Sequence, residues 1–234
     1  MPVHEIRRKL RRLGNKQRAK VSRRFFKTGP GEYGEGDVFL GIKVPELRKL
    51  AKEYQDLTTK EIKQLLKSPT HEERLLALLI LVRTYSKGNE TTKKGIYELY
   101  LKNTKFINNW DLVDGSAEYI VGDFLMDKSK KPLYSLAKSS DLWERRISIM
   151  STFHFIKRHE FSQTLKISKI LLSDEEHLIH KAVGWMLREV GKRHLPTEEK
   201  CLREHYKKMP RTMLRYAIER FPESKRQRYL RGSM

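Results

Sequence analysis

The sequence predicts an all-α protein built as an α-solenoid of stacked helix pairs. Apolar residues recur at helical spacing through almost the whole chain, and no segment alternates apolar and polar residues as a half-buried strand would. A faint repeat is also present, because five apolar residues near predicted helix starts lie 36, 35, 36 and 35 residues apart: Leu76, Leu112, Ile147, Val183 and Ile218. A fixed period of this size is typical of helix pairs that bury their faces against the next pair.

The elements follow one another in a simple order. Residues 1–28 form a basic N-terminal helix or arm, and a glycine-rich loop covers residues 29–37. Apolar helix faces then lie within residues 75–82, 113–124, 149–153 and 183–190. Helix breakers between them predict roughly a dozen helices joined by short links. The breakers are Ser68-Pro69, Lys87-Gly88-Asn89, Lys131-Pro132, Ser173-Asp174, Leu195-Pro196 and Met209-Pro210. We expect residues 1–234 to form one solenoid domain.

Composition indicates a globular protein with a heavily charged surface. Hydrophobic residues make up 38% of the 234 residues and charged residues 34%. No apolar run reaches the roughly 18–20 residues that span a membrane, and residues 1–27 lack the apolar stretch of a secretory signal. The single cysteine, Cys201, excludes an internal disulfide and a cysteine-based metal centre, and it favours a reducing compartment. We therefore expect a cytoplasmic protein with no membrane partner.

The positive charge is concentrated at the two ends of the chain. Residues 1–28 hold eleven Lys or Arg against Glu5 alone, and residues 200–231 hold eleven against Glu204, Glu219 and Glu223. The two ends supply +18 of the formal net charge of +21. This distribution favours a polyanionic partner, with nucleic acid as the first candidate. A membrane surface comes second, since neither end pairs its charge with a strong apolar face.

An acid beside an indole is unusual on so basic a chain. Trp110 and Asp114 lie four residues apart, which in a helix places both side chains on one face. The repeat assigns Trp110, Asp114, Arg146, Trp185 and Arg188 to equivalent helices of neighbouring units. Because equivalent helices of a solenoid line one surface, we expect these residues to converge on a concave, basic groove.

Four segments carry a resemblance to a known family. They are residues 39–48 (FLGIKVPELR), 109–114 (NWDLVD), 143–146 (WERR) and 181–189 (KAVGWMLRE). In this order they resemble the bacterial alkylpurine DNA glycosylases of the AlkD type, which are built from HEAT-like helical repeats. The similarity covers roughly residues 39–220. The Trp-x-x-x-Asp and Gly-Trp-x-Leu-Arg-Glu segments are its specific parts.

The resemblance implies an enzyme that excises N3- and N7-alkylated purines from duplex DNA. We expect it to be cofactor-free, monomeric and nucleoid-associated. It implies that Trp110, Trp185 and Asp114 hold the lesion nucleotide. It also implies that an arginine binds the DNA backbone near the lesion, and either Arg146 or its neighbour Arg145 fits that position. Arg188 is a candidate phosphate contact. The preference among N3-methyladenine, N7-methylguanine and bulkier adducts stays open.

A lone carboxylate suits this chemistry. An alkylated purine that already carries positive charge leaves as a neutral base, so no acid is needed to protonate it. Asp114 would then stabilise the oxocarbenium ion and position water, while each indole face attracts the cation by about 0.5–2 kcal/mol. We therefore expect excision to be confined to cationic lesions.

Two other functions compete with this interpretation. One is a binding module of the same fold that recognises DNA structure without catalysis. The other is a HEAT-type scaffold for RNA or protein, in which Trp110 and Trp185 are ordinary core residues.

Several motifs have simpler interpretations. The loop at residues 29–37 lacks the Gly-Lys-Ser/Thr ending of a phosphate cradle, so it is either a turn or a segment that orders on DNA through Tyr33. His177 and His180 lack a third ligand, so no metal site is expected. Trp143 is expected in the core or as a packing support for Arg146.

Overall fold

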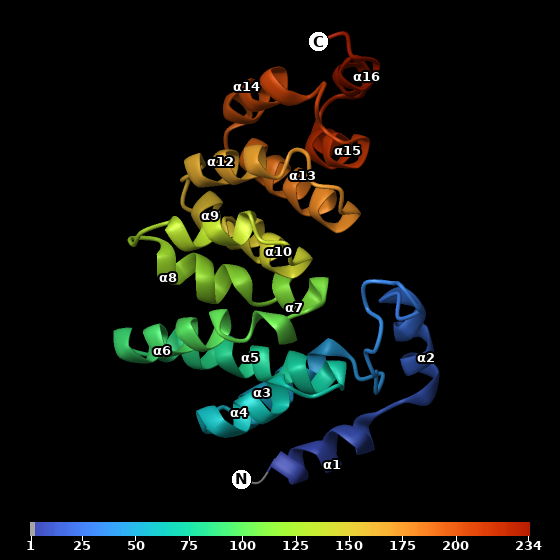
Figure 1. The fold of residues 1–234 in the computed structure, drawn as a ribbon, viewed down its shortest axis with the longest axis vertical. Coiled ribbons are helices and arrows are strands. Elements are labelled where there is room, and N and C mark those ends of the chain that lie inside the picture. The colour runs from blue at the N-terminus through green and yellow to red at the C-terminus, as the bar shows by residue number, and fades with distance from the viewer. Residues whose placement is uncertain (1–2) are drawn as a thin grey trace. The chain divides into compact units, whose positions relative to one another are not determined.

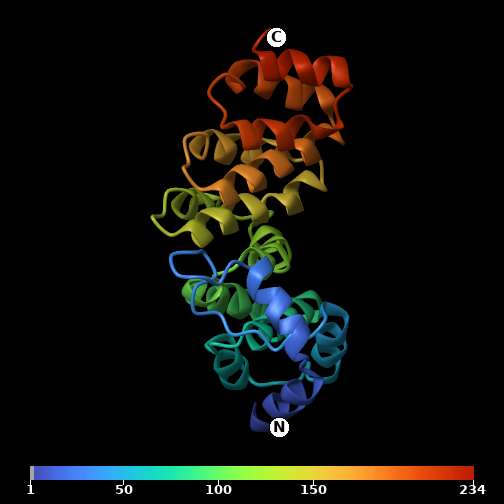
Figure 2. The ribbon, with the colours of Figure 1, turned by 90° about the vertical axis from the view of Figure 1, so that its right-hand side faces the viewer.

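The structure, a computed structural model, describes residues 3–234 and is all-α over those residues, without a β-strand. Its only extended pairing in the described range is an isolated bridge between Val38 and Thr70. The predicted fold class is therefore confirmed. The chain divides into two compact units, residues 1–116 and residues 117–234, and within each unit successive helices stack in layers (Figures 1 and 2). The single-domain assignment stays a prediction, and each unit is described by itself. None of the helices in residues 3–234 combines the length and the apolar character needed to cross a bilayer.

The first unit is organised around one long apolar helix. Its elements are α1 (Val3–Leu13), α2 (Lys16–Phe25), α3 (Val44–Glu53), α4 (Thr59–Leu66), α5 (His71–Lys87), α6 (Glu90–Leu101), the 3-10 turn η1 (Thr104–Phe106) and α7 (Trp110–Asp114). Helix α5 is apolar on most sides because it packs against α3, α4, α6 and α7. Its residues Leu76, Ile80 and Leu81 are at most 1% exposed.

The basic N-terminal segment forms two helices. Helix α1 buries Val3, Ile6 and Leu10, which share one face at helical spacing. An ion pair of 2.9 Å between Arg7 and Glu73 joins α1 to α5. Helix α2 buries only Ala19, so its cationic side chains remain on the surface.

The segment after the glycine-rich loop is fixed tightly against α2. Gly41 has a φ of +76°, and a Cβ there would lie 2.4 Å from both the Ala19 amide nitrogen and the Asn15 carbonyl oxygen. The carboxylate of Glu72 at the start of α5 accepts hydrogen bonds from the Gly41 and Leu40 amides at 2.7 and 2.9 Å. Glu72 of α5 therefore fixes the turn at Leu40 and Gly41, which packs against α2.

The glycine-rich loop bonds mainly to itself. The carboxylates of Glu32 and Glu35 accept hydrogen bonds of 2.8 Å from the amides of Gly29 and Gly31. The Tyr33 hydroxyl donates to the Phe25 carbonyl oxygen at 3.5 Å. Glu32 and Glu35 of this loop thus satisfy its own backbone, whereas a contact of Tyr33 with DNA stays a prediction.

The second unit is centred on α13. Its elements are the π-helix η2 (Glu118–Gly122), α8 (Asp123–Leu125), α9 (Lys131–Ala137), α10 (Leu142–Ser151), α11 (Phe153–Ile156), α12 (Ser162–Ile170), α13 (His177–Gly191), α14 (Leu195–His205), α15 (Arg211–Ala217), the 3-10 turn η3 (Ile218–Arg220) and α16 (Glu223–Arg231). Pro132 and Pro196 lie in the first turns of α9 and α14, where a missing amide hydrogen costs nothing. Helix α13 approaches α15 at Gly184, where a Cβ would lie 2.4 Å from the Met213 carbonyl oxygen.

The predicted repeat positions are all core positions. Leu76, Leu112, Ile147, Val183 and Ile218 have 0% exposure. The first four lie in α5, α7, α10 and α13. Ile218 is different, because it lies in η3 after the end of α15 and not near the start of a helix. The expected continuous helix face over residues 113–124 is also interrupted by the turn that follows α7 and by the π-helix η2.

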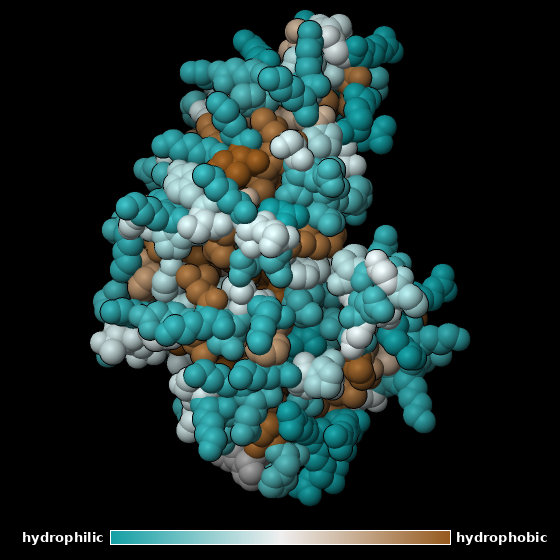
Figure 3. Space-filling view, in the orientation of Figure 1, coloured by the Kyte–Doolittle hydropathy of each residue, from teal (hydrophilic) through white to brown (hydrophobic). Residues whose placement is uncertain are grey.

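Hydrophilic side chains cover most of the face seen in Figure 3, as expected for a chain with 34% charged residues. A few large apolar residues are nevertheless exposed. Val21 and Phe25 of α2 are 59% and 64% exposed, and they lie one helical turn apart. Helix α2 therefore presents an apolar ridge among its cations.

Candidate functional site

Helix α7 carries the first two candidate residues. Asn109 caps the helix, because its side-chain oxygen accepts a hydrogen bond of 2.8 Å from the Trp110 amide. Trp110 and Asp114 are half-buried at opposite ends of this five-residue helix, whereas Leu112 and Val113 face the core. Burial raises the pKa of the Tyr100 hydroxyl, and the charge of Asp114 raises it further. The negative charge of Asp114 is therefore felt at Tyr100, a core residue whose hydroxyl forms a 2.9 Å hydrogen bond with the Ser116 hydroxyl.

Trp110 belongs to a cluster of packed rings. Its indole stacks on Phe26 with centroids 5.3 Å apart and an interplanar angle of 19°. Phe26 stacks on Phe39 at 4.9 Å, and Phe39 stacks on His71 at 4.5 Å. The exposed Phe25 meets Trp110 edge to face at 5.8 Å. Phe26, which directly follows α2, thus covers one face of the Trp110 indole and fixes the orientation of that ring.

A buried network of charged side chains lies behind α7. Asp37 receives hydrogen bonds from Arg74 at 2.6 Å and from the Asn109 side chain at 3.2 Å. His71 joins Asp37 to Asp111, with its Nδ1 3.1 Å from Asp37 and its Nε2 2.8 Å from Asp111. The side chains of His71 and Arg74 are 2% and 4% exposed. Four charged groups from a loop, α5 and α7 therefore meet in the core of the first unit.

The network sets the protonation of its members. Burial alone would lower the pKa of His71, but the hydrogen bonds that the ring donates to Asp111 and Asp37 outweigh it and raise that pKa to about 9. Burial alone would raise the pKa of Asp37, but the hydrogen bond from His71 and the charge of Arg74 lower it. At neutral pH the network therefore holds an imidazolium between two carboxylates.

In the second unit, Trp185 is held by a buried acid. The half-buried indole donates its Nε1 hydrogen to Glu189 at 3.3 Å and lies 6.1 Å from the ring of Phe153. Glu189 also forms ion pairs with Lys192 at 2.5 Å and Arg193 at 2.9 Å. Burial alone would raise the pKa of Glu189, but the hydrogen bonds from these two cations lower it. An ionised carboxylate thus fixes the polar edge of Trp185.

Cations cover the aromatic ring next to Trp185. The ammonium of Lys157 lies 4.4 Å from the centroid of Phe153, and the guanidinium of Arg193 lies 5.7 Å from it. Lys157 also pairs with the buried Glu118 at 2.5 Å. The second unit therefore presents aromatic and cationic groups together.

The three candidate arginines all make contacts within the second unit. Arg145 binds Asp174 at 2.6 Å and the carbonyl oxygen of Ser140 at 2.9 Å. Arg146 is 4% exposed and donates to the carbonyl oxygen of Leu178 at 2.6 Å. Arg188 pairs with Glu219. A contact of any of these arginines with DNA stays a prediction. Trp143 is 8% exposed, as expected for a core residue.

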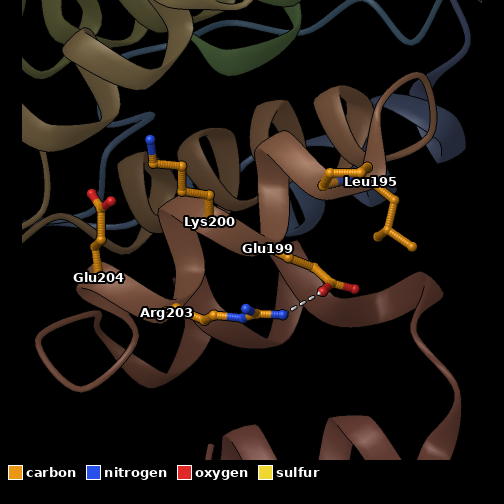
Figure 4. A pocket seen from close by; sticks show the side chains of 6 residues that line it. Leu195, Glu199, Lys200, Arg203 and Glu204 are labelled. Carbon is orange, nitrogen blue, oxygen red and sulfur yellow. Dashed lines mark hydrogen bonds and ion pairs between the residues drawn. The ribbon is translucent and has the colours of Figure 1, made fainter.

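A surface depression of about 520 Å³ lies elsewhere in the second unit, along α14 (Figure 4). Leu195, Glu199, Lys200, Arg203 and Glu204 line it together with Pro196. Arg203 and Glu199 pair with each other at 3.2 Å, which neutralises one of the two cations that line this depression. None of the candidate residues lines it. Within residues 3–234, no three His, Cys, Asp or Glu side chains are grouped to hold a metal ion.

Sequence reasoning missed the network around His71. A signal was present, because His71-Glu72-Glu73-Arg74 is a charged tetrapeptide directly before an apolar helix. All four residues are at most 5% exposed. Charged residues are almost never so deeply buried unless they are paired. The sequence does not show which residues pair with these four, so the network could not be predicted from it.

The fold and these two sets of residues define an all-α helical-repeat protein with a strongly basic surface. The family model described as DNA alkylation repair enzyme matches residues 6–221. The chain therefore belongs to the family of DNA alkylation repair enzymes.

Solved structures support the same fold. A structure described as a predicted DNA alkylation repair enzyme from Enterococcus faecalis aligns with a TM-score of 0.68 and 17% identity, over 90% of this chain and 97% of that chain. AlkD2 from Streptococcus mutans aligns with a TM-score of 0.53 and 20% identity, over 89% of this chain and 99% of that chain. Comparison with curated proteins gives no match. These likenesses agree with an all-α solenoid.

Proposed function

We propose that this protein is a DNA glycosylase that releases cationic N3- and N7-alkylated purines from duplex DNA. The observation that carries the proposal is the pair on α7, in which the half-buried Trp110 and Asp114 lie one turn apart in a protein of net charge +21. Membership of the DNA alkylation repair family supports the substrate class. The protein is proposed to act as a cytoplasmic, nucleoid-associated monomer without a cofactor.

The proposed reaction needs one carboxylate. The bond between the sugar C1′ and the purine nitrogen breaks, and its electron pair cancels the positive charge of the alkylated ring. The carboxylate of Asp114 stabilises the positive charge that develops on the sugar. Water then adds to C1′ and gives its proton to Asp114, which leaves a neutral base and an abasic site.

Helix α2 is proposed to bind the DNA as well, because it lies in the same unit as Trp110 and Asp114. Its cations, among them Lys20 and Arg24, are exposed, while Phe25 contacts Trp110. Phosphate contacts by such residues are independent of base sequence and weaken as salt is added. We propose that Trp185 of the second unit also contacts DNA, with Arg145 as the backbone contact, because Arg146 is 4% exposed whereas Arg145 is half-buried.

Release of free base from a duplex with one N7-methylguanine tests the proposal. The wild-type protein should release the base, whereas Asp114→Asn should lower turnover by roughly 100-fold or more while DNA affinity is kept. Asp56→Asn is the matched control, because Asp56 is an exposed acid of the same unit. Binding without release by the wild type would support the non-catalytic DNA-binding alternative. Robust release of uracil or of neutral 1,N6-ethenoadenine would contradict selection by the cationic leaving group.

A further inference from the structure

The network around His71 has a geometry that a neutral imidazole cannot satisfy. Both ring nitrogens lie within hydrogen-bond distance of a carboxylate oxygen, 3.1 Å from Asp37 and 2.8 Å from Asp111. A neutral imidazole has one N–H, so its other nitrogen would turn a lone pair toward a carboxylate. Both bonds form only when the ring is an imidazolium. At 2% exposure of the side chain, solvent cannot take the place of either partner.

The groups that face His71 come from every element packed against it. The glycine-rich loop provides Asp37, α5 provides Arg74, and α7 provides Asp111. The rings of Phe26 and Phe39 cover the imidazole at 5.0 and 4.5 Å. The guanidinium of Arg74 donates to Asp37 and to the Ser68 carbonyl oxygen. The Asp111 carboxylate is bound by His71 and by the backbone amide of Leu112.

Helix α7 depends on these contacts because it is too short to be stable alone. It has five residues, and a helix of this length has no favourable free energy of its own in water. Among its polar anchors to the rest of the unit are the Asn109 bond to Asp37 and the Asp111 bond to His71. Trp110 lies in the same cluster of rings that covers His71.

We propose that His71 is a positioning residue: by bonding Asp37 and Asp111 at the same time, it fixes the helix that presents Trp110 and Asp114. The proposal rests on the function proposed above. His71 touches no substrate in this arrangement and acts through Asp111. Loss of the ring proton breaks one of the two bonds and leaves the Asn109 bond to Asp37 as the remaining polar link between α7 and the loop, so the enzyme would lose activity on the alkaline side as the helix loses order.

Two variants separate this role from simple core packing. His71→Gln can serve at most one carboxylate as a donor, so it should loosen α7 at every pH. Asp111→Asn should instead rescue the network at high pH. A neutral His71 can donate from Nδ1 to Asp37 and accept at Nε2 from the new amide, so both bonds survive without the imidazolium. His4→Gln is the control, because His4 is an exposed histidine of α1 in the same unit.

Amide hydrogen exchange of residues 110–114, corrected for the intrinsic pH dependence, gives a readout that needs no enzymatic activity. In the wild type, protection should fall with a midpoint near pH 9, together with the titration of the His71 ring seen by nuclear magnetic resonance. Asp111→Asn should keep its protection up to about pH 10, and His4→Gln should behave as the wild type. The proposal would be overturned if protection in the wild type stays constant from pH 7 to 10. It would also be overturned if Asp111→Asn loses protection as His71→Gln does.

Base release then tests the link to function. At pH 7.5, His71→Gln should lower kcat by roughly 100-fold with little change in KM, because the reacting groups are displaced while DNA binding is kept. Asp111→Asn should retain activity at pH 7.5 and lack the alkaline decline of the wild type. An equal kcat for His71→Gln and the wild type would overturn the positioning role. If the wild type releases no base at any pH, the proposed glycosylase function fails, and the exchange experiment still decides whether His71 holds α7.

Discussion

Glu198 of α14 provides a quantitative prediction about stability. It is 2% exposed, its Oε1 has no hydrogen-bond partner, and its carboxyl group is pressed against Gly191 at the end of α13. Burial, together with the charge of the neighbouring Glu199, raises its pKa from an ordinary 4.5 to about 8 against the lowering effect of Arg188 and Lys225. The folded protein therefore prefers the protonated acid over a range of pH in which the unfolded chain is ionised.

The direction and size of the effect follow from this shift. Below pH 4.5 both states are protonated, so the unfolding free energy carries no cost from this group. As the pH rises to about 8 the cost grows, and it then stays constant. At ~1.4 kcal/mol for each tenfold change in proton affinity, the shift corresponds to about 5 kcal/mol. Glu198→Gln removes the ionisable group, so it should stabilise the second unit above pH 8 by several kcal/mol and change little at pH 4.5.

Urea unfolding followed by tryptophan fluorescence measures this difference. A Trp110→Phe background leaves Trp143 and Trp185, which both report on the second unit. The unfolding free energies of wild-type Glu198 and Glu198→Gln should diverge as the pH rises from 4.5 to about 8. Glu204→Gln, an exposed acid of the same helix, is the control and should follow the wild type. Parallel pH curves for Glu198→Gln and the wild type would refute the reasoning.

Three further predictions concern His71, Gly41 and Glu189. The raised pKa of His71 stabilises the first unit by about 3 kcal/mol, fully below pH 6.5, and this contribution should be lost as the pH rises to about 9. The unfolding free energies of the wild type and His71→Gln, measured in urea, should therefore converge over that range. Gly41→Ala should destabilise the first unit by about 1–3 kcal/mol in thermal unfolding, because the left-handed φ and the 2.4 Å approach to Ala19 both oppose a Cβ; an unchanged melting temperature would contradict this. Glu189→Gln should destabilise the second unit by about 1–3 kcal/mol at pH 7, because it leaves the Arg193 guanidinium without its carboxylate. As the lowered pKa of Glu189 requires, this loss should shrink as acid protonates the wild-type carboxylate, and a loss that is constant with pH would count against it.

The fold could be predicted because it depends on patterns that the sequence carries openly. Leu76, Leu112, Ile147 and Val183 share a repeat position, and each is completely buried in a helix. Pro132 and Pro196 begin helices, as their fixed φ favours. Ile218 departs from the pattern, because apolar spacing alone does not say where α15 ends and η3 begins.

The candidate site could be predicted only in part. Trp110 and Asp114 share α7 as their spacing indicated. The stacking of Trp110 on Phe26 and the burial of Asp37 in a charged network depend on contacts over 84 and 72 residues of chain, which no local pattern encodes. The acidic loop at residues 29–37 looked like a turn or a DNA-binding segment, whereas its last residue anchors α5 and α7.

Release of N7-methylguanine from a defined duplex by the wild type and by Asp114→Asn tests the central claim most directly. The wild type should release the base rapidly, the variant should release it roughly 100-fold more slowly or worse, and both should bind DNA with similar affinity. Equal release by the two proteins would contradict the role given to Asp114, and no release by a folded, DNA-binding wild type would contradict the glycosylase itself.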